Sequence, residues 1–228
     1  MEQEIKDCML CEFRLNLCKG MPENDFQSLF SLTVRNSYKK GEVILKQGIK
    51  THHLVYLNKG IVKFVHEENG RELIITIDKS PTLLGLANIL NEGVNLFSIV
   101  AIEECDGCLI DINRLKLLLM KNQEFMFNIM SISTKMFRKS VFNFISLAHK
   151  QVNGRIADIL IYLSQEIYAS NNFQLTLSRQ ELAEFAGCSK ENVIHTLRKF
   201  DADGIIKVSS KSIEIIDSER LLKISKTG

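Results

Sequence analysis

The chain has 228 residues, of which 45% are hydrophobic and 25% are charged, a composition typical of a globular protein with one or two domains. This composition excludes disordered, collagenous and low-complexity proteins. The formal net charge of +2 gives no general basic surface for a nucleic acid. Six cysteines are too few for a disulfide scaffold, so they favour thiols that are buried, redox-active or bound to a metal.

The sequence shows no export or membrane segment. Residues 1–7 are charged and lack the apolar stretch of a signal peptide. The most apolar stretch, residues 115–120, is far shorter than the roughly 20 residues that cross a bilayer. We therefore expect a cytoplasmic protein that does not contact a membrane.

Residues 40–110 have the pattern of a β-rich domain. Glycines separate short β-prone runs, which occupy residues 42–45, 54–57, 61–65 and 73–77. Short strands with turn residues roughly every ten positions are typical of a sandwich or small barrel. Two of the intervening turns contain asparagine and end in glycine, the residues that best tolerate the positive φ of tight turns.

The middle of the chain predicts long helices. No glycine or proline occurs between Asn113 and Gly154, which indicates one long helix or two helices in series. Residues 125–147 are apolar around most of the helix circumference, whereas packing on one domain requires a single stripe. We therefore expect a homodimer through this helix; the alternative is a central helix in a monomeric core. Further on, an amphipathic helix is predicted over residues 156–168 and a turn at residues 171–172.

A helix-turn-helix pattern follows this turn. Ser178 is expected to cap a short helix, with Glu181 at the second position of a capping box. Gly187 then supplies a tight turn, and Ser189 caps a second helix. Cys188 lies in the turn, where a small side chain is wanted for packing.

The second helix divides into an apolar face and a polar face. At about 100° per residue, one face carries Val193, Leu197 and Phe200, and the opposite face carries Glu191, His195 and Arg198. A helix that reads the DNA major groove needs this division, although an ordinary helical hairpin also shows it. Residues 149–228 contain eleven Lys and Arg against ten Asp and Glu, so phosphate binding must rely on local cations and helix N-termini.

Taken together, these segments resemble the Crp/Fnr family of bacterial transcription regulators. The resembling motifs are residues 38–48, 58–63 and 70–72 in the β-rich region, residues 186–193 at the turn, and residues 204–215 as a wing. The resemblance implies an α+β fold with a cyclic-nucleotide-binding-like β-roll (a jelly roll), a long dimerisation helix and a C-terminal winged helix-turn-helix. Its implied domains are a cysteine-rich segment at 1–20, the β-roll at 21–112, the dimerisation helix region at 113–150 and the DNA-binding domain at 151–228.

The resemblance also implies a function. We expect a homodimeric transcriptional regulator, an activator or a repressor and not an enzyme, that binds a palindromic site on double-stranded DNA and contacts RNA polymerase. The family positions that meet DNA correspond to Ser189, Lys190, Glu191, Asn192 and His195, and those that meet phosphates to Ser178 and Gln180. Arg198 is a further candidate for phosphate. His195 departs from the family, where this position is normally arginine.

The signal is not expected to be cyclic AMP. Family members that bind cyclic AMP carry an acidic residue after a glycine and then an arginine for the buried phosphate. The corresponding stretch, residues 81–93, has no acid directly after Gly85, and residues 81–102 contain no Lys or Arg. A phosphate buried there would lack a charge partner.

The cysteines suggest another sensor. Cys8, Cys11 and Cys18 form a C-x2-C-x6-C cluster, and Cys108 follows far along the chain. In the oxygen-sensing Fnr branch, three N-terminal cysteines and one late β-roll cysteine hold a [4Fe–4S] cluster. The resemblance therefore implies a cluster on these four residues and a redox or gaseous signal, with Cys105 as the competing fourth ligand. The alternatives are zinc, a thiol–disulfide switch, haem bound through His52, His53, His66 or His149, a small-ligand sensor, or no metal.

Overall fold

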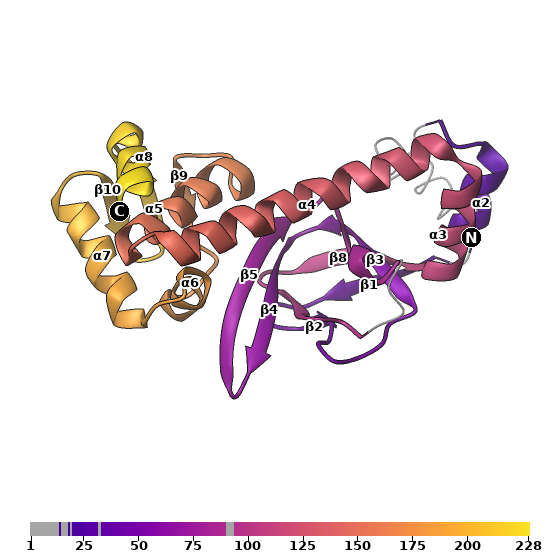
Figure 1. Cartoon of the computed structure of the whole chain (residues 1–228), viewed down its shortest axis with the longest axis horizontal. Helices are drawn as coiled ribbons and strands as arrows, with labels where there is room; N and C mark the ends of the chain where they lie inside the picture. The colour runs from indigo at the N-terminus through magenta and orange to yellow at the C-terminus, as the bar shows by residue number, and fades with distance from the viewer. Residues whose placement is uncertain (1–13, 15–17, 19, 32, 90–93) are drawn as a thin grey trace. The chain divides into compact units, whose positions relative to one another are not determined.

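The computed structural model describes residue 14, residue 18 and residues 20–31, 33–89 and 94–228 (Figure 1). The chain forms two compact units. The first contains the chain up to Phe64 together with Asp78–Arg138, and the second contains Val65–Ile77 together with Lys139–Gly228.

Two four-stranded sheets confirm the predicted β-roll. One has the strand order β1 (Val34–Tyr38), β8 (Cys105–Asp111), β3 (His53–Lys59) and β6 (Thr82–Leu84), and the other the order β2 (Val43–Leu45), β7 (Ser98–Ala101), β4 (Ile61–Glu68) and β5 (Arg71–Lys79). The four predicted runs correspond to β2, β3, β4 and β5. Asn69 and Gly70 join β4 to β5 with φ values of 52° and 73°, as a two-residue turn between twisted strands requires.

Helices cover one face of the β1-β8-β3-β6 sheet. They are α2 (Glu23–Phe30), α3 (Ile112–Lys121) and the start of α4 (Gln123–His149). Phe26, Leu115 and Phe125 from these helices share one buried apolar cluster with strand residues such as Leu54 and Ile110. The range expected to be β-roll, residues 21–112, therefore begins with a helix, α2. The apolar side chains of α2 are buried against the sheet.

The long helical region contains two helices in series. Asn122 separates α3 from α4 in an extended conformation, with φ −124° and ψ 103°. Its side-chain Oδ1 accepts a hydrogen bond from the backbone N–H of Phe125 (2.9 Å). Asn122 therefore satisfies one of the open N–H groups at the start of α4, which explains where the second helix begins.

The second unit carries the winged helix-turn-helix. Its helices are α5 (Val152–Tyr162, extended by a π-turn at Leu163–Ile167), α6 (Arg179–Ala186), α7 (Lys190–Ala202) and α8 (Ser218–Thr227), and its sheet has the order β10 (Ile206–Ser209), β11 (Ser212–Ile215) and β9 (Asn172–Gln174). The prediction of a turn at residues 171–172 is wrong at Asn172, which opens β9. Asn172 pairs with Glu214 on β11, a long-range partner that the local sequence does not reveal.

Asp158 on α5 joins three elements of the second unit. Its carboxylate accepts hydrogen bonds from Ser146 (2.6 Å), Lys150 (2.7 Å) and Ser225 (2.5 Å), which lie at the end of α4, just after it, and on α8. Charged hydrogen bonds of this kind hold helix ends together. Among the residues that the structure describes, no helix is long and apolar enough to cross a membrane.

Candidate DNA-binding surface and sensor face

The first helix of the helix-turn-helix begins with the predicted capping box. Ser178 Oγ accepts from the backbone N–H of Glu181 (3.1 Å), and Glu181 Oε2 accepts from the backbone N–H of Ser178 (2.8 Å). Gly187 ends the helix in the left-handed region with φ 57°. A side chain there would be strained, so glycine at this position sets the turn between α6 and α7.

The second helix, α7, is anchored on one face. Ser189 Oγ accepts from the backbone N–H of Asn192 (3.2 Å) and caps the helix. Val193, Leu197 and Phe200 are buried, as predicted. The hydroxyl of the buried Thr196 donates to Asn153 Oδ1 on α5 (2.9 Å), which adds a polar contact to this anchored face.

All eight predicted DNA-contacting side chains are exposed: Ser178, Gln180, Ser189, Lys190, Glu191, Asn192, His195 and Arg198. Six of them lie at the cap or on the exposed side of α7, and the other two lie at the start of α6. The backbone N–H of Glu191 and the Ser189 hydroxyl lower the pKa of the Glu191 carboxyl. Glu191 therefore presents an ionised acceptor next to the cation of Lys190.

A cavity of about 320 Å³ adds two cations to this surface. It is lined at the start of α6 and α7 by Ser178, Gln180 and Lys190, together with Arg179 and Lys211. Arg179 Nη2 donates to the Ser210 carbonyl in the wing turn (3.2 Å), while its Nη1 is buried without a protein partner. Burial lowers the pKa of Arg179. The clustered cations and helix N-termini suit an anion such as a DNA phosphate.

One face of the β1-β8-β3-β6 sheet, the candidate sensor face, carries two of the four predicted cysteines. Cys108 on β8 pairs directly with Tyr56 on β3, as Ile110 pairs with Leu54. Directly opposed residues in an antiparallel pair point to the same face, and Tyr56, Leu54 and Ile110 belong to the apolar cluster that contains Cys18. Cys18 and Cys108 therefore lie on the same face of the sheet, with exposed fractions of only 2% and 4%.

The other predicted ligands are not placed. Cys8 and Cys11 lie outside the described residues. Within the described part of the chain, no group of three or more His, Cys, Asp or Glu side chains could hold a metal. The haem candidates are scattered: His52, His53 and His149 are exposed, and His66 is partly buried.

Cys105, the competing fourth ligand, points to the opposite face. It is three residues from Cys108 on the same strand, and side chains alternate between faces along a strand. Its thiol donates to the Ile61 carbonyl (3.5 Å), and burial raises its pKa. Cys105 is therefore a packed, protonated thiol that faces away from Cys18. Cys188, in the helix-turn-helix, is half-buried, and burial raises its pKa as well.

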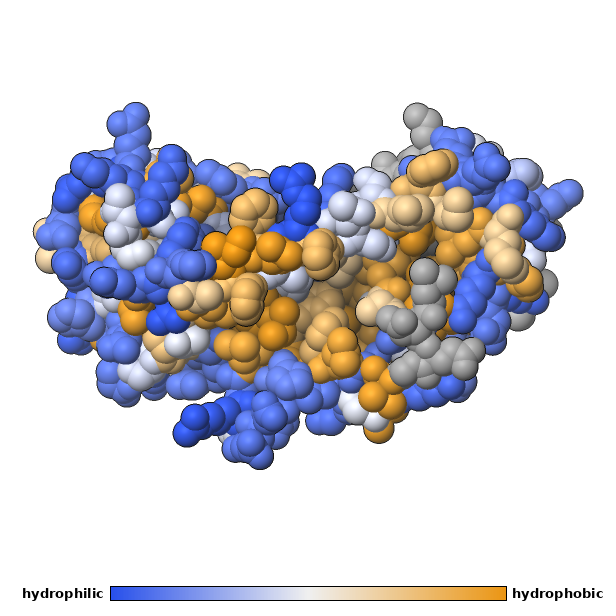
Figure 2. All heavy atoms as spheres, viewed as in Figure 1, coloured by the Kyte–Doolittle hydropathy of each residue, from blue (hydrophilic) through white to orange (hydrophobic). Residues whose placement is uncertain are grey.

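The long helix α4 carries an exposed apolar stripe. Met126, Met130, Phe137, Val141 and Phe144 recur at helical spacing with exposed fractions of 37%, 54%, 68%, 38% and 70%. Figure 2 shows apolar side chains gathered on the face along which α4 runs. A water-soluble monomer rarely exposes so many large apolar groups in one row.

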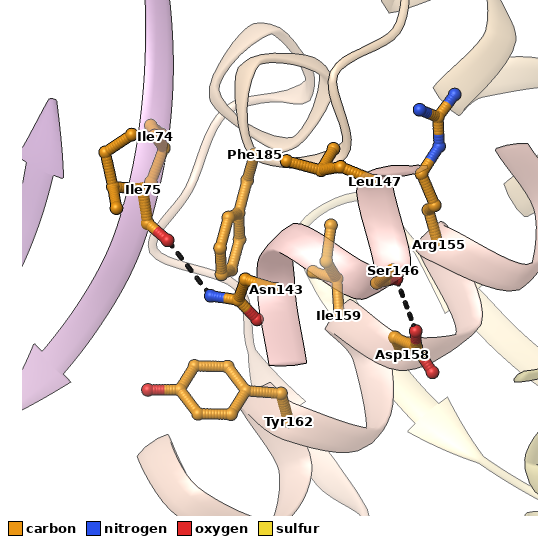
Figure 3. A pocket seen from close by; sticks show the side chains of 10 residues that line it. All are labelled: Ile74, Ile75, Asn143, Ser146, Leu147, Arg155, Asp158, Ile159, Tyr162 and Phe185. Atoms are coloured by element: carbon orange, nitrogen blue, oxygen red, sulfur yellow. Dashed lines mark hydrogen bonds between the residues drawn. The ribbon is translucent and has the colours of Figure 1, made fainter. Parts of the chain in front are cut away.

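A smaller cavity of about 40 Å³ lies inside the second unit (Figure 3). In its lining, the Asn143 side-chain amide donates to the Ile75 carbonyl (3.0 Å), and Ser146 donates to Asp158. A water molecule takes up about 30 Å³, so this space suits one water rather than an effector.

Models of two known domain families match this chain. Residues 35–122 match the cyclic nucleotide-binding domain, and residues 154–224 match the Crp-like helix-turn-helix domain. The chain belongs to the Crp/Fnr family of transcription regulators. Its similarity to the transcriptional activator protein Anr of Pseudomonas protegens is 26% identity, covering 98% of this chain and 93% of Anr.

Other Crp/Fnr relatives differ in name. The cAMP-activated regulator CRP of Salmonella typhimurium is 25% identical over 86% of this chain and 97% of its own length. The solved structure of FixK2 from Bradyrhizobium japonicum covers 86% of this chain and 99% of FixK2 with a TM-score of 0.78 at 18% identity, which supports the fold alone. Anr and CRP are named as transcription regulators, and the Crp-like helix-turn-helix model matches this chain, so it is a DNA-binding transcription regulator and not an enzyme.

Two cations of the DNA-binding surface were not predicted from sequence. Arg179 directly follows the predicted cap Ser178, and Lys211 sits in the turn of the predicted wing. The sequence signal that could have identified these two cations is their position next to the helix cap and inside the wing of this Crp/Fnr chain. The sequence alone does not show that the wing turn lies next to the start of α6, where Arg179 donates to the Ser210 carbonyl.

Proposed function

We propose that this regulator is a homodimer that senses a redox or gaseous signal through a [4Fe–4S] cluster and transmits it to two DNA-reading helices. The observation that carries the proposal is the placement of Cys18 and Cys108 on one buried face of the β-roll, against the start of the dimer helix. Phe125 and Ile129 of α4 belong to the same apolar cluster as Cys18.

The donor set fits an iron–sulfur cluster. Cys8, Cys11, Cys18 and Cys108 would supply the four thiolates that such clusters take. Bound there, the cluster would supply a redox-active centre whose assembly or loss reports the signal. The chain's own part is mechanical: Cys18 belongs to the same buried apolar cluster as Phe125, so a change in how Cys18 is held would change the packing at the start of α4.

The exposed stripe on α4 supports the homodimer. A second copy of α4 would cover Met130, Phe137 and Phe144 in a parallel or antiparallel helix pair. In a two-fold dimer, two copies of α7 would enter successive major grooves about 34 Å apart on a palindromic site. A signal that alters the α4 pairing would change this spacing and thereby the affinity for DNA.

The exposed face of α7 supports specific readout. Glu191 can accept from cytosine N4, and Lys190 can donate to guanine, while Arg198 and the cations around Ser178 meet phosphates. RNA polymerase remains the expected protein partner of the DNA-bound dimer.

Cyclic AMP is the second candidate signal, because relatives of this chain are named as cAMP-activated. The stretch that would meet the phosphate turns at Gly85, with φ 86°, and continues with the apolar Leu86. The absence of Lys and Arg from residues 81–102 disfavours this candidate.

One experiment tests the proposed signal. The full chain is purified without oxygen, and its iron, sulfide, zinc and visible spectrum are measured. About four irons and four sulfides per chain support the cluster. Zinc in place of iron assigns the thiolates to a structural site. A colourless protein without metal that is activated by cyclic AMP overturns the proposal.

A further inference from the structure

Asn58 occupies an irregular position beside the sensor face. Leu57 on β3 pairs with Gly107 on β8, but Lys59 pairs with Asp106, the next residue along. Two steps on β3 thus match one step on β8, and Asn58 is the extra residue of a β-bulge. Asn58 is two residues after Tyr56, the partner of Cys108, so strand alternation puts its side chain on the same face as Cys108.

The side chain of Asn58 reaches sulfur. Asn58 Nδ2 donates a hydrogen bond to Cys108 Sγ at 3.2 Å across the two strands. Asn58 is partly buried and Cys108 is 4% exposed, so water competes little for this contact. A hydrogen bond from a partly buried donor restricts the directions that the sulfur atom can take.

We propose that Asn58 is a positioning residue for the sensor: its amide hydrogen bond holds Cys108 Sγ in the orientation in which it binds the metal centre. This inference rests on the proposed function in that Cys108 is taken as a ligand. Groups that donate to a ligand atom fix its orientation and raise its affinity, and their loss typically weakens metal binding about 10–100-fold. Cys105, on the opposite face, receives no such donor from Asn58.

The first experiment uses the anaerobically loaded full chain. Loss of iron to a ferrous chelator, without oxygen, is followed by the visible absorbance. Asn58→Leu keeps the size of the side chain and removes the donor, so iron loss should be about tenfold faster. Asn58→Gln keeps an amide and should lie closer to the wild type.

Ser37→Ala is the matched control. The Ser37 hydroxyl donates to Asp106 on the same strand as Cys108 (2.7 Å) without contacting the sulfur. Iron loss from this variant should match the wild type. If Asn58→Leu matches the wild type, or if both variants accelerate iron loss equally, the hydrogen bond to sulfur has no special role and the inference is overturned.

The second experiment needs no metal. Unfolding of metal-free protein at one fixed protein concentration is measured for Asn58→Leu, Cys108→Ala and the double variant. A real contact gives a coupling of about two- to tenfold in the unfolding constant, and additive effects overturn it. A wild type that takes up no iron overturns the cluster proposal instead, so the two failures are distinguishable.

Discussion

The DNA-binding surface and the sensor face are built in opposite ways. The DNA-binding surface is local: its eight predicted side chains fall between residues 178 and 198, and its caps are hydrogen bonds across three residues. The sensor face is assembled from distant parts: Asn58 contacts Cys108 across two paired strands, and Cys18 comes to the same face through the helices packed on the sheet. A local site can be predicted from spacing, whereas a distant one depends on register.

This difference has a physical origin. Helix caps and helix faces follow from periodicity and from side-chain bonds to nearby backbone groups. Strand pairing instead fixes which of two neighbouring residues faces a site, and a shift by one residue exchanges the faces. The choice between Cys105 and Cys108 is therefore a question about register.

The largest expected effect tests the sensor face directly. Cys108→Ser removes a proposed ligand and should abolish the colour and iron of anaerobically prepared protein. Cys105→Ser should retain both, because Cys105 faces away from Cys18. Iron analysis and the visible spectrum measure the outcome. Loss of iron from the Cys105 variant with retention in the Cys108 variant would contradict the face assignment.

The next largest effect concerns the exposed apolar stripe on α4. This stripe lies outside both the DNA-binding surface and the sensor face, and the proposed dimer forms through it. Phe137→Glu would bury an unpaired charge in a dimer interface, at a cost of about 3–5 kcal/mol. Sedimentation should then show a monomer at concentrations where the wild type is a dimer. Leu222→Glu, at a 45% exposed position on α8, is the control and should remain dimeric. A monomeric wild type would exclude the dimer.

Much of the fold followed from the sequence where signals were local. The strands β3, β4 and β5 have β-branched and aromatic residues between turn glycines, and the structure confirms them. β8 is not among the four predicted runs, because Asp106 and Gly107 weaken its β-propensity. It is nevertheless a central strand, held by pairing with β1 on one side and β3 on the other.

The candidate sites show the same limit. Val193, Leu197 and Phe200 were predicted to anchor α7 from angles alone, and they are buried. Asn58 was predicted only as a turn residue, because nothing in its local sequence places it next to Cys108. Its contact with Cys108 depends on the register between β3 and β8, which is a property of the pairing between two strands.

A moderate effect is expected from substitutions on the exposed face of α7, which is proposed to contact base pairs. Glu191→Ala should reduce binding to the cognate site by about 1–3 kcal/mol and relax the preference at one base pair per half-site. Binding to a library of DNA sites measures both effects. Because hydrogen bonds from its own backbone N–H and from Ser189 lower the pKa of Glu191, the base preference should be lost at a lower pH than an ordinary glutamate would give.

Arg198→Ala is the matched comparison for Glu191. Loss of a phosphate contact should weaken binding to all sequences alike and make the salt dependence less steep. An unchanged sequence preference in Glu191→Ala would remove this residue from the reading face.

The smallest expected effect tests how local the DNA-binding surface is. Ser178→Ala removes the hydroxyl that accepts from the Glu181 backbone N–H and breaks the capping box. The free energy of unfolding should fall by about 1 kcal/mol, as for other lost caps, which chemical denaturation can measure. Ser212→Ala, in the wing, is the control; its hydroxyl makes a longer contact of 3.4 Å with Asn172, so its loss should have less effect. If the cap is local, the anaerobic spectrum of Ser178→Ala should match that of the wild type. A spectral change would show that the two regions are coupled even where the sequence separates them.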